Sequence, residues 1–216
     1  MAIHRVGRWT ADGGGLRPWQ ARTAALYADG GCIKKNPSPD GGTWAWCAVD
    51  ADGWMIHSEH GWFSPPTESE GGKEGLIPVV ENNQSEMLAV LLGIRALKAF
   101  DPSWSGLVST DSQLTIRRWT QGASLKNIPY DWRRRMGELL RMPGDVGYHR
   151  RWTLLDGHPT ALQLEENAGK RGHPVSIHNK TCDKLCQQAA VRFQTPGAGS
   201  LETLVLSPLD TRAVAV

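Results

Sequence analysis

The stretch Gly106–Gln113 reads GLVSTDSQ and joins a short apolar segment to a carboxylate and then to a helix signal. The apolar part predicts a buried strand that ends at Asp111. Ser112 is a favourable N-cap residue, so a helix is predicted over Ser112–Trp119. Because sites in open α/β sheets form where strands end and helices begin, Asp111 is a candidate site residue.

The segments on either side of this stretch predict further strands and helices. Upstream, two strands joined by a hairpin signal at Asp52-Gly53 follow a first strand, which suggests an antiparallel meander. The expected strands are Thr23–Ala28, Thr43–Val49, Trp54–Phe63, 106–110 and Trp152–Leu155, and the expected helices are Ser85–Phe100, Ser112–Trp119, Tyr130–Arg141 and Asn179–Phe193. The order βββαβααβα predicts an α/β fold with a five-stranded mixed sheet, three antiparallel strands and then parallel ones, flanked by helices.

The chain of 216 residues has the length of one domain with short ends. Polar residues and a glycine triplet predict an irregular N-terminal arm over 1–22, and Pro and Gly predict a C-terminal tail over 194–216, leaving a compact domain over 23–193. The four cysteines lack zinc-type spacing, no apolar run reaches membrane-span length, and the N-terminus has no signal-peptide centre. We expect a cytoplasmic monomer without a membrane partner.

The net charge of +2 conceals an uneven distribution of charge. Residues 29–86 hold ten acids and three bases, whereas residues 112–151 hold nine bases and three acids. A metal site beside a face that binds a polyanion would produce this pattern, and two separately solvated faces would produce it equally.

Four carboxylates stand near the ends of predicted elements. Asp29 and Asp111 follow strands, Glu86 opens the longest helix, and Asp183 lies near the start of the last one. If they converge they repel one another unless a cation binds, and oxygen ligands suit Mg²⁺ or Mn²⁺. Each could instead be an ordinary turn residue or an acid in a first helical turn.

Five motifs in order resemble ribonuclease H, type 1, and together they span residues 25–193, about four-fifths of the chain. They are Leu26–Cys32 (LYADGGC, followed by Asn36-Pro37 and Gly41-Gly42), Glu81–Leu92 (ENNQSEMLAVLL), Val108–Gln113 (VSTDSQ), Asp156–Pro159 (DGHP) and His178–Ala189 (HNKTCDKLCQQA). The resemblance implies a ribonuclease H-like fold and a metal-dependent endonuclease that hydrolyses the RNA strand of RNA–DNA hybrids and leaves 5′-phosphomonoesters.

The resemblance also implies a role for each acid. Asp29, Glu86, Asp111 and Asp183 are similar to residues that hold two Mg²⁺ ions, with Mn²⁺ as a possible substitute and Asp29 as the bridging ligand. His158 resembles a mobile histidine that shuttles protons or aids product release. His173 is a rival for that role because it also lies in a Gly-His-Pro triplet.

Substrate recognition is expected to depend on the 2′-hydroxyl groups of RNA. The residues similar to the family's minor-groove contacts are Cys32, Asn36, Asn82, Asn83 and Gln113, with Asn179 as a further candidate. Amides suit this task because they both donate and accept hydrogen bonds. The alternatives are turn and capping roles, and Asn179 in particular could be the N-cap of the last helix.

The chain departs from the family pattern in two places. Glu81 lies where many members grip a DNA phosphate, and an acid there would repel phosphate. The segment Trp119–Tyr130 is too short for the basic protrusion of many bacterial members, so this chain would be a divergent member. A substitute basic surface is expected from Arg117, Arg118, Arg133, Arg134 and Arg135.

Two other functions are consistent with the motifs. The chain could be a nuclease of the same fold that cuts DNA or double-stranded RNA, or a catalytically silent nucleic-acid-binding module. Among the tryptophans, those on predicted strands (Trp44, Trp46, Trp54 and Trp62) are expected to pack, whereas Trp119, Trp132 and Trp152 lie nearer the expected substrate side.

Overall fold

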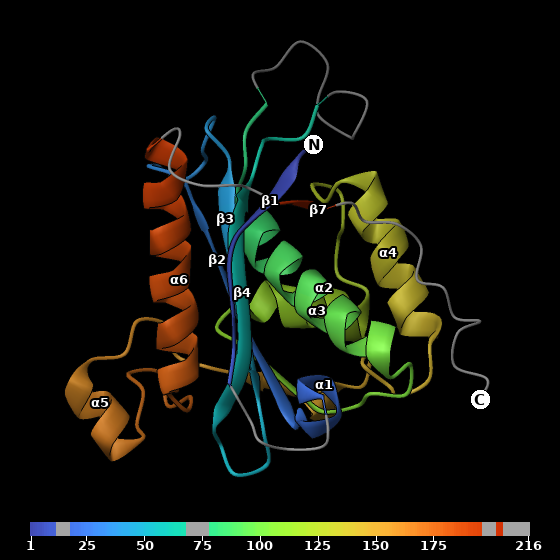
Figure 1. Cartoon of the computed structure of the whole chain (residues 1–216), viewed down its shortest axis with the longest axis vertical. Coiled ribbons are helices and arrows are strands. Elements are labelled where there is room, and N and C mark those ends of the chain that lie inside the picture. Colours follow the sequence, from blue (N-terminus) through green and yellow to red (C-terminus); the bar gives the residue numbers. More distant parts are fainter. Residues whose placement is uncertain (12–17, 68–77, 196–201, 205–216) are drawn as a thin grey trace.

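The computed structural model describes residues 1–11, 18–67, 78–195 and 202–204, and in that part the chain forms a mixed sheet between two layers of helices (Figure 1). The strands are β1 (Ile3–Thr10), β2 (Ala25–Cys32), β3 (Gly42–Val49), β4 (Met55–Phe63), β5 (Leu107–Thr110), β6 (Trp152–Leu154) and β7 (Glu202–Leu204). Their order across the sheet is β6-β5-β2-β3-β4-β1-β7. β2, β3 and β4 pair antiparallel, and β5 and β6 continue the sheet parallel to β2, which confirms the predicted α/β fold.

Helices cover both faces of the sheet. The helices are α1 (Trp19–Arg22), α2 (Asn82–Phe100), α3 (Gln113–Gln121), α4 (Tyr130–Arg141), α5 (Ala161–Glu166) and α6 (Ile177–Gln194). Figure 1 shows α2, α3 and α4 on one side and α6 on the other. Alternate residues of β2 face opposite layers, so Leu26 and Ala28 join the core under α2, and Tyr27 packs with Cys182 of α6.

The predicted irregular arm over 1–22 is wrong, because β1 pairs with β4 along almost its whole length and the sheet has seven strands. The strand is held by long-range contacts that its polar sequence does not reveal: Ile3 is buried, and Arg5 and Arg8 pair with Glu59 of β4. From the predicted tail over 194–216, the short β7 pairs with β1. Residues 12–17, which include the glycine triplet, and residues 196–201 and 205–216 lie outside the described part.

Two further elements differ from the prediction. The segment expected as a loop before the last helix contains α5, which begins at an N-cap hydrogen bond from the Gln163 N–H to the Thr160 side chain. α6 begins at Ile177 with Ser176 as its N-cap, so Asn179 is a buried residue of the first turns and is not the cap. No helix in the described residues is both long enough and apolar enough to cross a membrane.

The tryptophans pack differently from the prediction at several positions. Trp44 and Trp46 are fully buried on β3, as expected. Trp54 precedes β4 instead of lying in it and is 73% exposed. The three tryptophans assigned to the substrate side are all buried: Trp119, Trp132 and Trp152. They are part of the hydrophobic core, and none of them presents a ring surface for stacking on a nucleotide.

Candidate active site

Asp29 and Asp111 come from neighbouring parallel strands at the centre of the site. Tyr27 of β2 lies opposite Ser109 of β5, so two residues further along each strand Asp29 and Asp111 are neighbours. Asp29 does not end its strand as predicted, because β2 continues to Cys32 and Asp29 pairs with Ala45 of β3. Its side chain is therefore held in the interior of the sheet and is 7% exposed.

Gly30 allows α2 to approach this point of the sheet. A Cβ on Gly30 would lie 2.2 Å from the carbonyl carbon of Ser85 and 2.4 Å from the backbone nitrogen of Glu86. Glycine at this position therefore brings the second turn of α2, and with it Glu86, directly against β2. α6 supplies Asp183 from the other face of the sheet, where Cys186 contacts the Asp29 carbonyl.

The electrostatics of Asp29 show that the other acids lie near it. Burial raises the pKa of Asp29 well above its ordinary value, and the negative charge of Asp111 raises it further. The charges of Asp183 and Glu86 act in the same direction. A hydrogen bond at 2.7 Å from the Gly30 N–H to Asp29 Oδ1 opposes the rise. Four separate elements thus bring four carboxylates into one electrostatic cluster.

Glu86 and Asp111 are also displaced toward their protonated forms. Burial raises the pKa of Glu86 to about 7, and the negative charge of Asp111 adds to the rise. Hydrogen bonds from Ser112 and Asn82 act in the opposite direction. Burial likewise raises the pKa of Asp111, and the charge of His158 is the largest opposing effect. In the described part of the chain, Glu86 Oε2 and Asp111 Oδ1 are buried without a hydrogen-bond partner.

The donor set fits a hard divalent cation in its chemistry. Among the residues that the structure describes, no group of three or more His, Cys, Asp and Glu side chains is arranged to hold a metal ion. The two buried carboxylate oxygens without partners, Glu86 Oε2 and Asp111 Oδ1, nevertheless need either a proton or a cation, because an unpaired buried carboxylate is costly. Oxygen donors alone suit Mg²⁺ or Mn²⁺, and a cation would relieve the repulsion within the cluster.

The loop after β6 presents His158 to the acids. His158 Nδ1 lies 3.5 Å from Asp183 Oδ2, and 77% of its side chain is exposed. The loop reaches this place through Gly157, where a Cβ would lie 2.4 Å from Asp111 Oδ2. His173 instead lies beside Asp156, whose carboxylate binds Arg171. Of the two candidate histidines, His158 is the one the structure places against the acids.

Three of the predicted substrate-binding residues form a hydrogen-bonded chain that leads to Glu86. The thiol of Cys32 donates to Asn36 Oδ1 at 3.5 Å, and the backbone N–H of Asn82 donates to the same oxygen at 3.2 Å. The Asn82 amide then donates to Glu86 Oε1 at 2.8 Å. The turn after β2 and the start of α2 are thereby joined into one surface.

The other three predicted substrate-binding residues lie at separate positions. Asn83 is half-buried next to Asn82, and Gln113 is exposed at the start of α3. Asn179 is buried in α6, where its side chain hydrogen-bonds to Asp111 and lowers the pKa of that carboxyl. Asn179 is therefore in contact with the acid cluster and is not part of the Cys32–Asn36–Asn82 surface.

The predicted basic surface is only partly present. Arg118 and Arg135 are buried, since Arg118 donates to backbone carbonyls and Arg135 pairs with Glu138. Arg134 is paired with Asp131 and Glu138. Of the five arginines, Arg117 and Arg133 are exposed. The prediction was wrong for Arg118 and Arg135 because adjacent residues on a helix point to different sides.

Glu81 lies where the start of α2 meets the segment before α4. Its backbone N–H donates to Gln84 Oε1 at 2.8 Å, and its carboxylate accepts from the Asn127 amide at 3.4 Å. Arg118 reaches the same turn through the Asn83 carbonyl, a contact for which no local sequence signal exists. The first turn of α2 is therefore tied down by residues 118–127.

Comparisons with known proteins relate the chain to ribonucleases H by sequence. No family model matches the chain. The ribonuclease H of Rhodopirellula baltica is 30% identical over 170 residues, which cover 78% of this chain and 90% of that protein. The ribonuclease H of Bordetella avium is 29% identical over 163 residues, covering 76% of this chain and 87% of the relative.

Solved structures with similar folds include two ribonucleases H1. The enzyme of the halophilic archaeon Halobacterium salinarum aligns with a TM-score of 0.47 and 21% identity, covering 78% of this chain and 97% of its own. LC11-RNase H1, solved with an RNA/DNA hybrid, aligns with a TM-score of 0.49 and 15% identity, covering 79% of this chain and 99% of its own. On the relative that is 30% identical over most of both sequences, the chain belongs to the ribonuclease H family.

Proposed function

We propose that the protein is an endonuclease that hydrolyses the RNA strand of RNA–DNA hybrids by a two-metal-ion mechanism and leaves 5′-phosphomonoesters. The observation that carries the proposal is the cluster of four acids from β2, α2, the residue after β5, and α6, in which buried carboxylate oxygens of Glu86 and Asp111 have no partner in the described part of the chain. A binding module would gain nothing from this arrangement, because clustered negative charge repels nucleic acid.

Each acid has a place in the proposed reaction. Asp29, Glu86, Asp111 and Asp183 would hold the two Mg²⁺ ions, and bound ions would supply activation of a water and stabilisation of the leaving 3′ oxygen. Asp29 is the acid on which the charges of the other three all act, so its carboxylate would be the one most relieved by bound cations. His158 is exposed and lies next to Asp183, so its ring is able to accept or return a proton at the edge of the cluster.

Selection for RNA is proposed to depend on the polar surface beside the acids. The chain from Cys32 through Asn36 to Asn82 ends on Glu86, so a ribose held by these groups lies next to the reacting phosphate. Both amides keep further donor and acceptor atoms for a 2′-hydroxyl. Asn83 and Gln113 extend this surface along α2 and α3.

The test is cleavage of a labelled RNA–DNA hybrid compared with DNA and RNA duplexes of the same sequence, with Mg²⁺ and with EDTA. We expect cleavage of the hybrid's RNA strand in Mg²⁺, slower cleavage in Mn²⁺, and no cleavage in EDTA. Asp111→Asn should abolish cleavage and keep hybrid binding, whereas Asp131→Asn, an exposed acid of α4, should cleave normally.

Three results would contradict the proposal. Preferential cleavage of DNA or double-stranded RNA would favour a nuclease of another specificity. Glu81 makes this alternative worth testing, because an acid at that position would repel a DNA phosphate of the hybrid. Binding without cleavage in both the unaltered protein and Asp111→Asn would favour a silent module. Cleavage that persists in EDTA would exclude the metal mechanism.

A further inference from the structure

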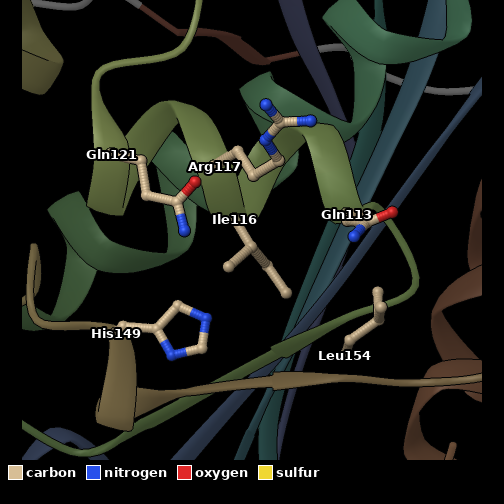
Figure 2. Close-up of a pocket in the computed structure, with 6 residues that line it drawn as sticks. All are labelled: Gln113, Ile116, Arg117, Gln121, His149 and Leu154. Atoms are coloured by element: carbon tan, nitrogen blue, oxygen red, sulfur yellow. The ribbon is translucent and has the colours of Figure 1, made fainter.

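A hollow of about 380 Å³ lies beside the acid cluster, between α3 and the edge strand β6. It is lined by Gln113, Ile116, Arg117, Gln121, His149 and Leu154, and Figure 2 shows these side chains around the opening. His149 belongs to η2 (His149–Arg151), the short 3₁₀ helix before β6. The volume is at the small end of the range of about 300–1,000 Å³ for ligand pockets.

The lining combines an apolar floor with polar groups that have no structural partner. Ile116 and Leu154 form the floor. Within the described residues, the side chains of Gln113, Gln121 and His149 make no hydrogen bond to protein. In Figure 2 the amide of Gln121 and the ring of His149 stand opposite each other across the hollow. An apolar floor flanked by side chains with free hydrogen-bonding atoms is typical of a site for a flat polar ligand.

The hollow lies close to the proposed reaction site along the chain and in the register of the sheet. Gln113 follows Asp111 by two residues, and Leu154 lies opposite Thr110 in the register of β5 and β6. With a rise of 1.5 Å per helical residue, Gln121 lies roughly 12 Å beyond Gln113 along α3. A strand that crosses Asp111 and continues over Gln113 would therefore enter the hollow.

The charge around the hollow suits a phosphodiester chain. No acid lines it, and the Arg117 guanidinium stands at its rim, directed away from His149 (Figure 2). Arg150 and Arg151 of η2 are exposed beside it. In the part of the chain that the structure describes, none of these three arginines forms an ion pair. Their positive charges are available to phosphate.

We infer that this hollow binds an unpaired nucleotide of the RNA strand, in a single-stranded segment adjoining the hybrid. The base lies on Ile116 and Leu154 beside the His149 ring, with its edge toward the amides of Gln121 and Gln113, and the phosphate faces Arg117. Aromatic rings, His included, bind splayed-out RNA bases by stacking, whereas a base inside a duplex would first have to be unstacked. The inference rests on the proposed function, because the strand that crosses Asp111 is the one that is cut.

The experiment measures affinity with Asp111→Asn protein, which should bind without cutting. The probes are one fluorescein-labelled blunt hybrid and the same hybrid with a short single-stranded extension on the 5′ or 3′ end of either strand, read by fluorescence anisotropy. We expect an RNA extension at one end to tighten binding about tenfold, the effect of one stacked base. DNA extensions should give no such gain.

Two added substitutions locate the gain. His149→Leu and Gln121→Leu, both at exposed positions, should each reduce the ratio of the affinity for the extended hybrid to that for the blunt hybrid to nearly one. The control is Gln188→Leu, at an exposed glutamine of α6, which should retain the full ratio. Equal binding of blunt and extended hybrids would overturn this inference alone. An equal gain from a DNA extension, or a gain that survives both pocket substitutions, would also overturn it. Failure to bind any hybrid would overturn the proposed function instead.

Discussion

Arg118 Nη1 of α3 donates a hydrogen bond at 3.1 Å to the backbone carbonyl of Asn83 in the first turn of α2. The Nε of the same guanidinium donates to the Ser124 carbonyl at 3.2 Å, and the side chain is buried. Its charge also opposes the rise that burial causes in the pKa of Glu86. Arg118 therefore joins the helix that begins after Asp111 to the turn that carries Asn82 and Asn83.

This contact predicts that Arg118 positions Asn82 and Asn83, the residues proposed to select RNA. Arg118→Leu removes two hydrogen bonds from a charged donor, so the free energy of unfolding should fall by about 2–4 kcal/mol. The KM for the hybrid should rise about tenfold with a smaller change in kcat, and Arg118→Lys should recover part of the affinity. Urea unfolding and steady-state cleavage measure the two effects. A loss of stability with KM unchanged would show that the role is structural only.

The repulsion among the acids predicts an unusual effect of Asp111→Asn on stability. In EDTA the variant should be more stable than the unaltered protein, by on the order of 1 kcal/mol, because a buried carboxylate with a raised pKa is removed. Mg²⁺ should raise the melting temperature of the unaltered protein and have less effect on the variant. Asp131→Asn, an exposed acid of α4, is the control and should respond to Mg²⁺ as the unaltered protein does.

The ion pairs of Glu59 with Arg5 and Arg8 of β1 predict how the stability of the protein depends on pH. Burial raises the pKa of the Glu59 carboxyl, but the hydrogen bond from His57 and the charges of Arg5 and Arg8 outweigh burial, and the pKa lies below its ordinary value. The folded protein therefore binds this proton less readily than the unfolded chain. The stabilisation is complete above about pH 4.5 and is lost as the pH falls further.

Glu59→Gln should remove this pH dependence. Near neutral pH the variant should unfold more easily by about 1–3 kcal/mol, and the difference should shrink as the pH drops below about 4.5. Glu165→Gln, an exposed acid of α5, serves as the control. Denaturant unfolding across the pH range measures both variants. A difference that stays constant down to pH 3 would contradict the assigned role of the Glu59 charge.

The close approach of α2 to Gly30 predicts that an added methyl group at this position is not tolerated. In Gly30→Ala the added carbon would meet the α2 backbone at 2.2 Å, so strand and helix would have to separate. We expect a loss of about 2–4 kcal/mol in unfolding free energy and a much larger loss of cleavage, because Glu86 moves away from Asp29. Gly137→Ala is a suitable control, since its added carbon meets only the Arg141 side chain at 3.6 Å in α4. Normal cleavage by Gly30→Ala would refute the close approach.

The central elements could be predicted because their signals are local. The apolar run before Asp111, the Ser112 cap and the periodic apolar face of α2 all act within a few residues, and the Ser112 side chain does accept from Thr115 N–H. β1 could not be predicted, since its sequence is polar and its partners in β4 lie far along the chain, from Thr10 opposite His57 to Ile3 opposite Phe63. The same limit applies to Arg118, whose carbonyl partner is 35 residues away.

The sequence predicts candidate residues for the site but not how the fold holds them. The motif order selected the four acids as candidates and placed Asn82 near Glu86, where the structure has a hydrogen bond. It did not reveal that Asn179 is buried against Asp111, because a helix boundary depends on a cap, and that cap is Ser176. The burial of three tryptophans was likewise missed, since only tertiary packing decides which helix face is covered.

β1 also changes what the sheet offers to other molecules. Without it, the nine residues of β4 would present a row of unpaired amide and carbonyl groups at the rim of the sheet. Such open strands pair with strands of neighbouring chains and start aggregation. β1 occupies that rim and is fixed to it by the ion pairs of Arg5 and Arg8 with Glu59, and β7 in turn covers Ile3–Arg5 of β1. The N-terminal strand thus moves the open edge of the sheet from the nine-residue β4 to a strand that carries two arginines.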